Sequence, residues 1–186
     1  MSHKARIAPA EAPYSDAVAA QLDKIMPPGV EPLILFKTLA RDQRLFSRFM
    51  GAGLLDKGNL SMREREIAID RTTARCGSEY EWGVHVAFFA ARVGLTPEQI
   101  AGTEEVPANE DVWTEAELLI VKLMDELHET STISEALWRD LEQHYTEMQI
   151  LELIMLAGFY HTVSFITNGL RLPLEAFGTR FTVRDE

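Results

Sequence analysis

The sequence predicts an all-α fold, and three observations support this prediction. Five stretches match a capping box, in which a Ser or Thr precedes a helix and a Glu or Gln follows three residues later. Apolar residues recur at helical spacing, and no stretch alternates long enough to predict a strand. Gly77 and Gly94 follow helical patterns, where a chain often turns left-handed. The capping boxes pair Ser61 with Glu64, Ser78 with Glu81, Thr96 with Gln99, Thr114 with Glu117 and Thr146 with Gln149.

The helices follow one another along nearly the whole chain. In order, we expect them at residues 14–25, 32–40, 43–55, 62–75, 79–93, 97–101, 115–129, 135–144 and 147–170. The stretch "MPPGVEP", 26–32, predicts a rigid turn, and "GTEEVPANEDVW", 102–113, predicts a loop. No linker or low-complexity segment interrupts the pattern. We therefore expect one helical domain over residues 1–186.

Charge and composition indicate which partners and which cellular compartment to expect. The 186 residues carry a formal net charge of −11, which disfavours nucleic acid and anionic membrane surfaces as partners. The single cysteine, Cys76, cannot form a disulfide within one chain, and we expect a cytoplasmic protein. The most apolar run, 150–170, is long enough to span a bilayer, but Glu152, His161 and Asn168 would then lie in the apolar slab. We predict a core or interface helix there and no membrane association.

Three polar residues lie on apolar helical stripes. Glu66 shares a face with Met62 and Ile69, so its carboxylate is either ion-paired or directed to a cleft. His85 lies one helical turn after Glu81, which can accept a hydrogen bond from the imidazole, orient the ring and raise its basicity. The alternative is structural: Glu81 completes a capping box, Glu66 pairs with an arginine, and His85 bonds a core carbonyl.

The remaining histidines and the cysteine give weaker signals. His161 lies on an apolar stripe and is a candidate to face the same cavity as His85. His128 and Cys76 both end predicted helices, which favours structural roles. Glu66, Glu81, His85 and His161 are of the types that bind zinc or iron, but no two-histidine helix motif is present. We predict no bound metal.

The stretch "LSMREREIAIDRTTARCGSEYEWGVHVAFFAARVGLTPEQI", residues 60–100, resembles the core of the carboxymuconolactone decarboxylase family, which includes the alkylhydroperoxidase D-like proteins. The resemblance extends through "WTEAELLIVKLMDELHETSTISEALW" and "QILELIMLAGFYHTVSFITNGLRLPLE" and covers most of the chain. It implies an all-helical fold, assembly into dimers, trimers or hexamers, and a cavity near subunit contacts. Members of this family include lactone decarboxylases and cysteine-dependent peroxidases.

One departure separates this chain from the peroxidases. Their motif is Cys-x2-Cys-x3-His, and when it is aligned on His85 the two cysteine positions fall on Ser78 and Glu81. A dithiol–disulfide cycle needs both thiols, so this chain cannot run it. The family's acid on the preceding helix matches Glu66, and its histidine matches His85. The resemblance therefore implies that this chain retains the family's acid–base residues and lacks its redox cysteines.

We accordingly expect an enzyme, a carbon–carbon lyase that decarboxylates or otherwise processes a small carboxylated ring compound without a cofactor. His85 would donate the proton, Glu81 would orient it and Glu66 would complete the relay. The predicted substrate-binding residues are Arg71, Arg75, Tyr80, Trp82 and His161, with an arginine holding the carboxylate. Two alternatives remain: a peroxide-related activity, disfavoured by the missing cysteines, and a non-catalytic helical oligomer that binds a small acid.

Overall fold

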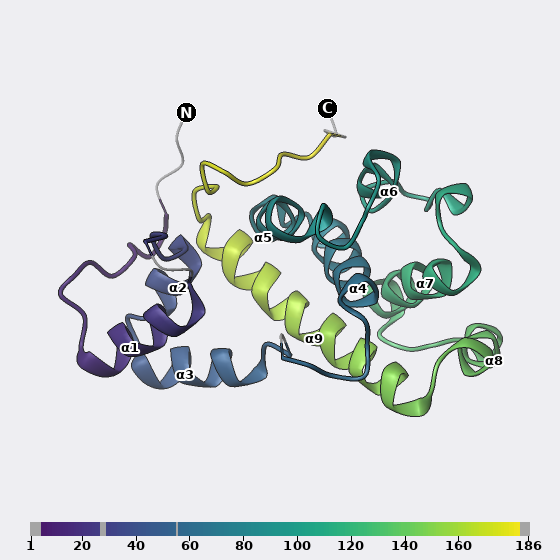
Figure 1. Cartoon of the computed structure of the whole chain (residues 1–186), viewed down its shortest axis with the longest axis horizontal. Coiled ribbons are helices and arrows are strands. Elements are labelled where there is room, and N and C mark those ends of the chain that lie inside the picture. The colour runs from purple at the N-terminus through teal and green to yellow at the C-terminus, as the bar shows by residue number, and fades with distance from the viewer. Residues whose placement is uncertain (1–4, 27–28, 55, 183–186) are drawn as a thin grey trace.

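The structure is a computed structural model that describes residues 5–26, 29–54 and 56–182 (Figure 1). Within these residues all regular structure is helical, and the predicted all-α fold is confirmed. The helices are α1 (Asp16–Ile25), α2 (Ile34–Leu39), α3 (Gln43–Ala52), α4 (Met62–Arg75), α5 (Glu79–His85), α6 (Pro97–Gly102), α7 (Glu115–Thr130), α8 (Glu135–His144) and α9 (Glu147–Leu170). A π-helical turn, Val86–Ala90, continues α5, and a 3₁₀ turn, Glu110–Val112, precedes α7.

The core of the molecule is built around α4, which packs against α5, α7 and α9. In Figure 1, α9 runs diagonally across the middle, with α1–α3 on one side and α7 and α8 on the other. Residues of α4 from Arg65 to Thr73 are all buried, including four that are charged at neutral pH in water. Burial of so many polar side chains on one helix needs specific partners, and these partners build the site described below.

Local capping signals determine most helix starts. Four of the five predicted capping boxes are present with both hydrogen bonds, at Ser61, Thr96, Thr114 and Thr146. The fifth, at Ser78, is wrong. The Ser78 side chain makes no capping bond and instead lies 2.8 Å from the Thr167 hydroxyl, in the interior between α5 and α9. Glu81 is therefore not engaged as a capping residue.

The predicted single helix over 79–93 is also interrupted. The α-helical pattern ends at His85 and widens into the π-helical turn Val86–Ala90. Such turns are rare and occur frequently at functional sites. Here the turn begins directly after the candidate histidine.

The C-terminal segment after α9 passes back over α5. A Cβ atom added to Gly83 would lie 2.2 Å from the Thr179 carbonyl oxygen, so only glycine permits this approach. The Thr179 amide donates to the Gly83 carbonyl at 3.0 Å, and Phe177 packs on Phe88 with ring centroids 5.0 Å apart. The tail thereby fixes the helix that carries His85.

Helix α9 has two different faces. By length and composition it could cross a membrane, yet its inner face is buried in the bundle and includes Leu153, Leu156 and Tyr160. Its outer face exposes large apolar side chains over several turns. These are Met148, Leu151, Met155 and Phe165.

Candidate active site

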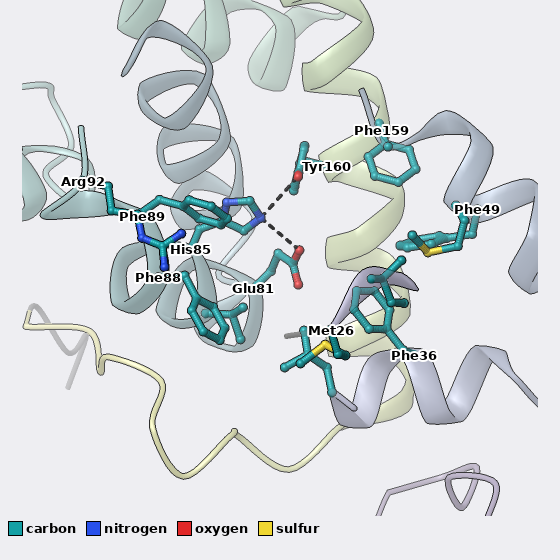
Figure 2. A pocket seen from close by; sticks show the side chains of 15 residues that line it. Met26, Phe36, Phe49, Glu81, His85, Phe88, Phe89, Arg92, Phe159 and Tyr160 are labelled. Atoms are coloured by element: carbon teal, nitrogen blue, oxygen red, sulfur yellow. Dashed lines mark hydrogen bonds and ion pairs between the residues drawn. The ribbon is translucent and has the colours of Figure 1, made fainter. Parts of the chain in front are cut away.

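A cavity of about 300 Å³ lies between the N-terminal helices, α5 with its π-helical turn, and α9 (Figure 2). This volume is at the lower end of the range for small-molecule sites. Apolar and aromatic side chains make up most of the lining. The lining residues are Ile25, Met26, Leu33, Phe36, Phe49, Met50, Gly53, Glu81, Val84, His85, Phe88, Phe89, Arg92, Phe159 and Tyr160.

His85 connects the buried carboxylates of α4 to this cavity. Its Nδ1 lies 2.7 Å from Glu66 Oε2, and Glu66 is fully buried behind it. Its Nε2 lies 3.2 Å from the Tyr160 hydroxyl and 3.5 Å from Glu81 Oε1, as the dashed lines in Figure 2 show. The ring is therefore held on its inner nitrogen by Glu66 and presents its outer nitrogen to the cavity.

The surrounding charges keep this imidazole protonated. Burial alone would lower the pKa of His85, but the charge and hydrogen bond of Glu66, together with Glu81, raise it to about 10. Burial, reinforced by the charges of Glu81 and Glu66, raises the pKa of Tyr160 well above its ordinary value. At neutral pH the cavity thus contains an imidazolium and a neutral phenol, both able to donate.

Several buried oxygens near His85 have no hydrogen-bond partner. Among the described residues these include Glu66 Oε1, Asp70 Oδ1 and Glu81 Oε2. Arg65 Nε lies 3.6 Å from Glu66 Oε1 and gives partial charge compensation. Burial, followed by the charge of Glu66, raises the pKa of Asp70 well above its ordinary value. Glu81 belongs to the cavity lining, and its Oε2 is a buried acceptor without a hydrogen-bond partner.

The cavity also contains one positive side chain besides His85. Arg92 is an exposed lining residue whose guanidinium carbon lies 5.7 Å from the centroid of the Phe89 ring. Figure 2 shows it on the same side as Phe88 and Phe89. A guanidinium here can pair with a carboxylate bound beside the aromatic side chains.

The structure brings together three predicted site residues, Glu66, Glu81 and His85, but exchanges two roles. We expected Glu81 to orient the imidazole and Glu66 to complete a relay. The 2.7 Å contact shows that Glu66 orients the ring, whereas Glu81 lies at 3.5 Å and lines the cavity.

The two predicted carboxylate-binding arginines lie away from the cavity. Arg71 is fully buried and binds Asp125 through two contacts of 2.7 Å, while also donating to carbonyls of the loop after α6. Arg75 lies 3.2 Å from Asp125 and 2.7 Å from Glu129. Both guanidinium groups therefore cross-link α4 to α7, whereas the arginine among the lining residues of the cavity is Arg92.

Three further predicted lining residues also have other partners. Tyr80 is buried and hydrogen-bonds Glu175, and Trp82 donates its indole N–H to Thr103 at 2.9 Å. Both contacts anchor the helix that carries His85 to other parts of the chain, and neither residue lines the cavity. His161 contacts His128 instead of the cavity. The described cluster of metal-binding residue types, Cys76 with these two histidines, therefore lies outside the cavity.

Sequence reasoning missed Tyr160 and Arg92. Tyr160 is 75 residues from His85, and nothing in the local pattern links the two. Arg92 did carry a usable signal, since it lies seven residues after His85 and thus on the same helical face.

Comparisons with known proteins agree with this architecture. Residues 43–119 match the model of the carboxymuconolactone decarboxylase family. No curated protein matches the chain. Among solved structures, an uncharacterized peroxidase-related protein from Silicibacter sp. TM1040 has a TM-score of 0.77 and 18% identity over 97% of this chain and 98% of its own.

Two further structures extend the likeness of fold. The alkylhydroperoxidase AhpD core of an uncharacterized peroxidase-related protein from Ralstonia eutropha JMP134 has a TM-score of 0.72 and 16% identity over 98% of this chain and all of its own. A variant of the debrominase Bmp8 bound to 2,3,4-tribromopyrrole has a TM-score of 0.68 and 16% identity over 95% of each chain. At these identities the likeness concerns the fold.

Proposed function

We propose that the protein is an acid–base enzyme acting on a small carboxylated ring compound, because residues 43–119 match the model of the carboxymuconolactone decarboxylase family and the cavity holds a suitable proton donor. The observation that supports this most strongly is the imidazolium of His85, fixed by Glu66 at 2.7 Å and presenting Nε2 to a largely aromatic cavity. Such a group can protonate a substrate atom on which negative charge develops. The reaction we propose is decarboxylation.

In this proposal the substrate ring lies against the aromatic lining, with its carboxylate toward Arg92. The carbon–carbon bond to the carboxylate breaks, carbon dioxide leaves, and the electron pair passes into the conjugated ring system. His85 Nε2–H donates the proton that replaces the carboxyl group, and solvent then restores that proton. Overall, one carboxylate and one proton become one carbon–hydrogen bond and carbon dioxide.

The neighbouring groups have distinct parts in this scheme. Glu66 stabilises the imidazolium and orients it as a positioning residue, because it contacts His85 and not the cavity. Tyr160 donates a hydrogen bond to oxygen on the substrate, as expected of a phenol whose pKa is raised. Glu81 accepts a hydrogen bond from a substrate hydroxyl or from another donor on the substrate ring.

The size and lining of the cavity support a small planar ligand. The solved debrominase structure contains 2,3,4-tribromopyrrole, also a small planar ring, within a similar fold. A peroxide-related activity has less support, since the sole cysteine is outside the cavity lining and burial raises its pKa.

Ultraviolet-monitored turnover of 4-carboxymuconolactone tests the proposal. We expect turnover by the unchanged protein, its loss in His85→Ala, and retention in the matched control His144→Ala, whose histidine pairs with Glu115 on the surface. Equal turnover in His85→Ala would refute the proposed proton donor. Absence of turnover in the unchanged protein would exclude this substrate, and saturable binding without turnover would support the non-catalytic alternative.

We also propose that the protein self-associates through the outer face of α9. Met148, Leu151 and Met155 follow the alternating three- and four-residue spacing of a helix-pairing stripe, and each is more than half exposed. Phe165, which is 70% exposed, continues the apolar surface toward the C-terminal end.

A further inference from the structure

A cluster of metal-binding side chains lies at the junction of α4, α7 and α9, separate from the cavity. It consists of Cys76 at the end of α4, His128 near the end of α7 and His161 in the middle of α9. One donor atom from each residue lies within 4.8 Å of the other two. From this convergence we propose a binding site for a divalent cation of the zinc type.

The distances between donor atoms are close to those of a tetrahedral zinc site. His128 Nδ1 lies 3.1 Å from His161 Nε2 and 3.8 Å from Cys76 Sγ. Zn–N bonds of about 2.05 Å and Zn–S bonds of about 2.3 Å require separations of about 3.3 Å between nitrogens and about 3.6 Å between nitrogen and sulfur. Small side-chain adjustments therefore suffice to admit the ion.

A neighbouring hydrogen bond prepares His161 as a ligand. Its Nδ1 lies 2.8 Å from the Ala157 carbonyl oxygen, which can only accept, so the proton is on Nδ1. The lone pair of Nε2 is consequently directed at His128 and Cys76. Fixing a histidine tautomer through a backbone carbonyl is a common feature of zinc sites.

The electrostatic surroundings permit a cation. Arg75 is the nearby positive group, but it is paired with Asp125 at 3.2 Å and with Glu129 at 2.7 Å, so its charge is offset. A thiolate and two imidazoles are a donor set that suits Zn²⁺, with the thiol proton released on binding. All three residues are half-buried, which leaves a fourth position for water.

Without a metal, the same contacts form a simple network in which His128 donates to His161. The two cases differ in a measurable way, because the chain has only one cysteine. A thiolate-to-metal charge-transfer band can therefore arise only from Cys76. A bound ion would also link α4, α7 and α9 and so stabilise the folded state.

Titration of the full chain with Co²⁺, followed by competition with Zn²⁺, tests the site. We expect one equivalent of Co²⁺, a near-ultraviolet sulfur charge-transfer band that Zn²⁺ displaces, and a higher Tm with Zn²⁺. Cys76→Ser should abolish the band, and His161→Gln should weaken binding by more than the 10- to 100-fold typical for loss of a second-shell partner.

Two controls separate this site from other histidines. His144→Gln removes a surface histidine and should leave the band and the affinity unchanged, whereas His85→Gln tests the cavity. The proposal is overturned if Co²⁺ does not bind, if it binds without a sulfur band, or if Cys76→Ser leaves the affinity intact. Loss of binding in His85→Gln alone would also overturn it, by assigning the ion to the cavity.

Discussion

Glu66→Gln should destabilise the protein in a pH-dependent manner, because it removes the charge that keeps His85 protonated. Raising the pKa of a buried histidine from its ordinary 6.5 to about 10 corresponds to on the order of 5 kcal/mol of stability. That stability is fully present below pH 6.5 and is lost as the pH rises through the folded-state pKa near 10. Breaking a buried ion pair from one side costs about 3–5 kcal/mol, so we expect a loss of this size at pH 6.

Urea unfolding at pH 6 and pH 9.5, together with an NMR titration of the labelled imidazole, measures both effects. The difference between Glu66→Gln and the unchanged protein should shrink at the higher pH, and the pKa of His85 should fall in the variant. Glu81→Gln is the matched control: its carboxylate is 3.5 Å from the ring, against 2.7 Å for Glu66, and a smaller loss is expected. An imidazole that titrates near pH 6.5 in both proteins would refute the reasoning.

Three further variants probe the tail, the outer face of α9 and the cavity. Gly83→Ala would place a methyl group against the tail backbone and should lower the free energy of unfolding in urea by about 1–3 kcal/mol. The control Gly158→Ala, where a Cβ atom would have nothing within 4 Å, should stabilise α9 by about 0.5–1 kcal/mol. Equal effects of the two substitutions would contradict the close approach of the tail to Gly83. Leu151→Lys should lower the mass measured by light scattering, while Gln143→Lys should not, and a monomeric unchanged protein would exclude the proposed self-association. Arg92→Leu should raise KM roughly tenfold for a carboxylated substrate with kcat little changed, and an unchanged KM would exclude its role as the carboxylate anchor.

The parts of the fold that follow from local chemistry could be predicted from the sequence. Most helix bounds agree within two or three residues, because Ser, Thr, Gly and Pro act on the backbone beside them. Ser78 shows the limit: its sequence signal is as good as that of Ser61, but its hydroxyl contacts Thr167, a residue 89 positions away. Tertiary contacts prevailed there over the local signal.

The site was predictable where the family motif specifies it and unpredictable where distant segments meet. Glu66 and His85 come from the motif, but their direct contact at 2.7 Å across 19 residues was not predicted, since Glu81 was expected to orient the ring. Arg71 looked equally suitable for a substrate, yet its partner Asp125 is 54 residues away and no local pattern reveals it. Tyr160 was missed for the same reason.

The arrangement around His85 is difficult to explain as a device for stability alone. Buried ion pairs are often no more stabilising than apolar side chains of similar size, and this group adds carboxylate oxygens with no partner. Glu66 and Asp70 lie in the fully buried run of α4 from Arg65 to Thr73, where the fold could accept aliphatic residues at lower energetic cost. Yet the polar group extends through His85 to the lining of a cavity that is otherwise mostly apolar. One buried acid with a raised pKa, an imidazolium held by Glu66 and carboxylate oxygens without a partner converge beside one cavity, which is the arrangement that the proposed proton transfer to a ligand needs.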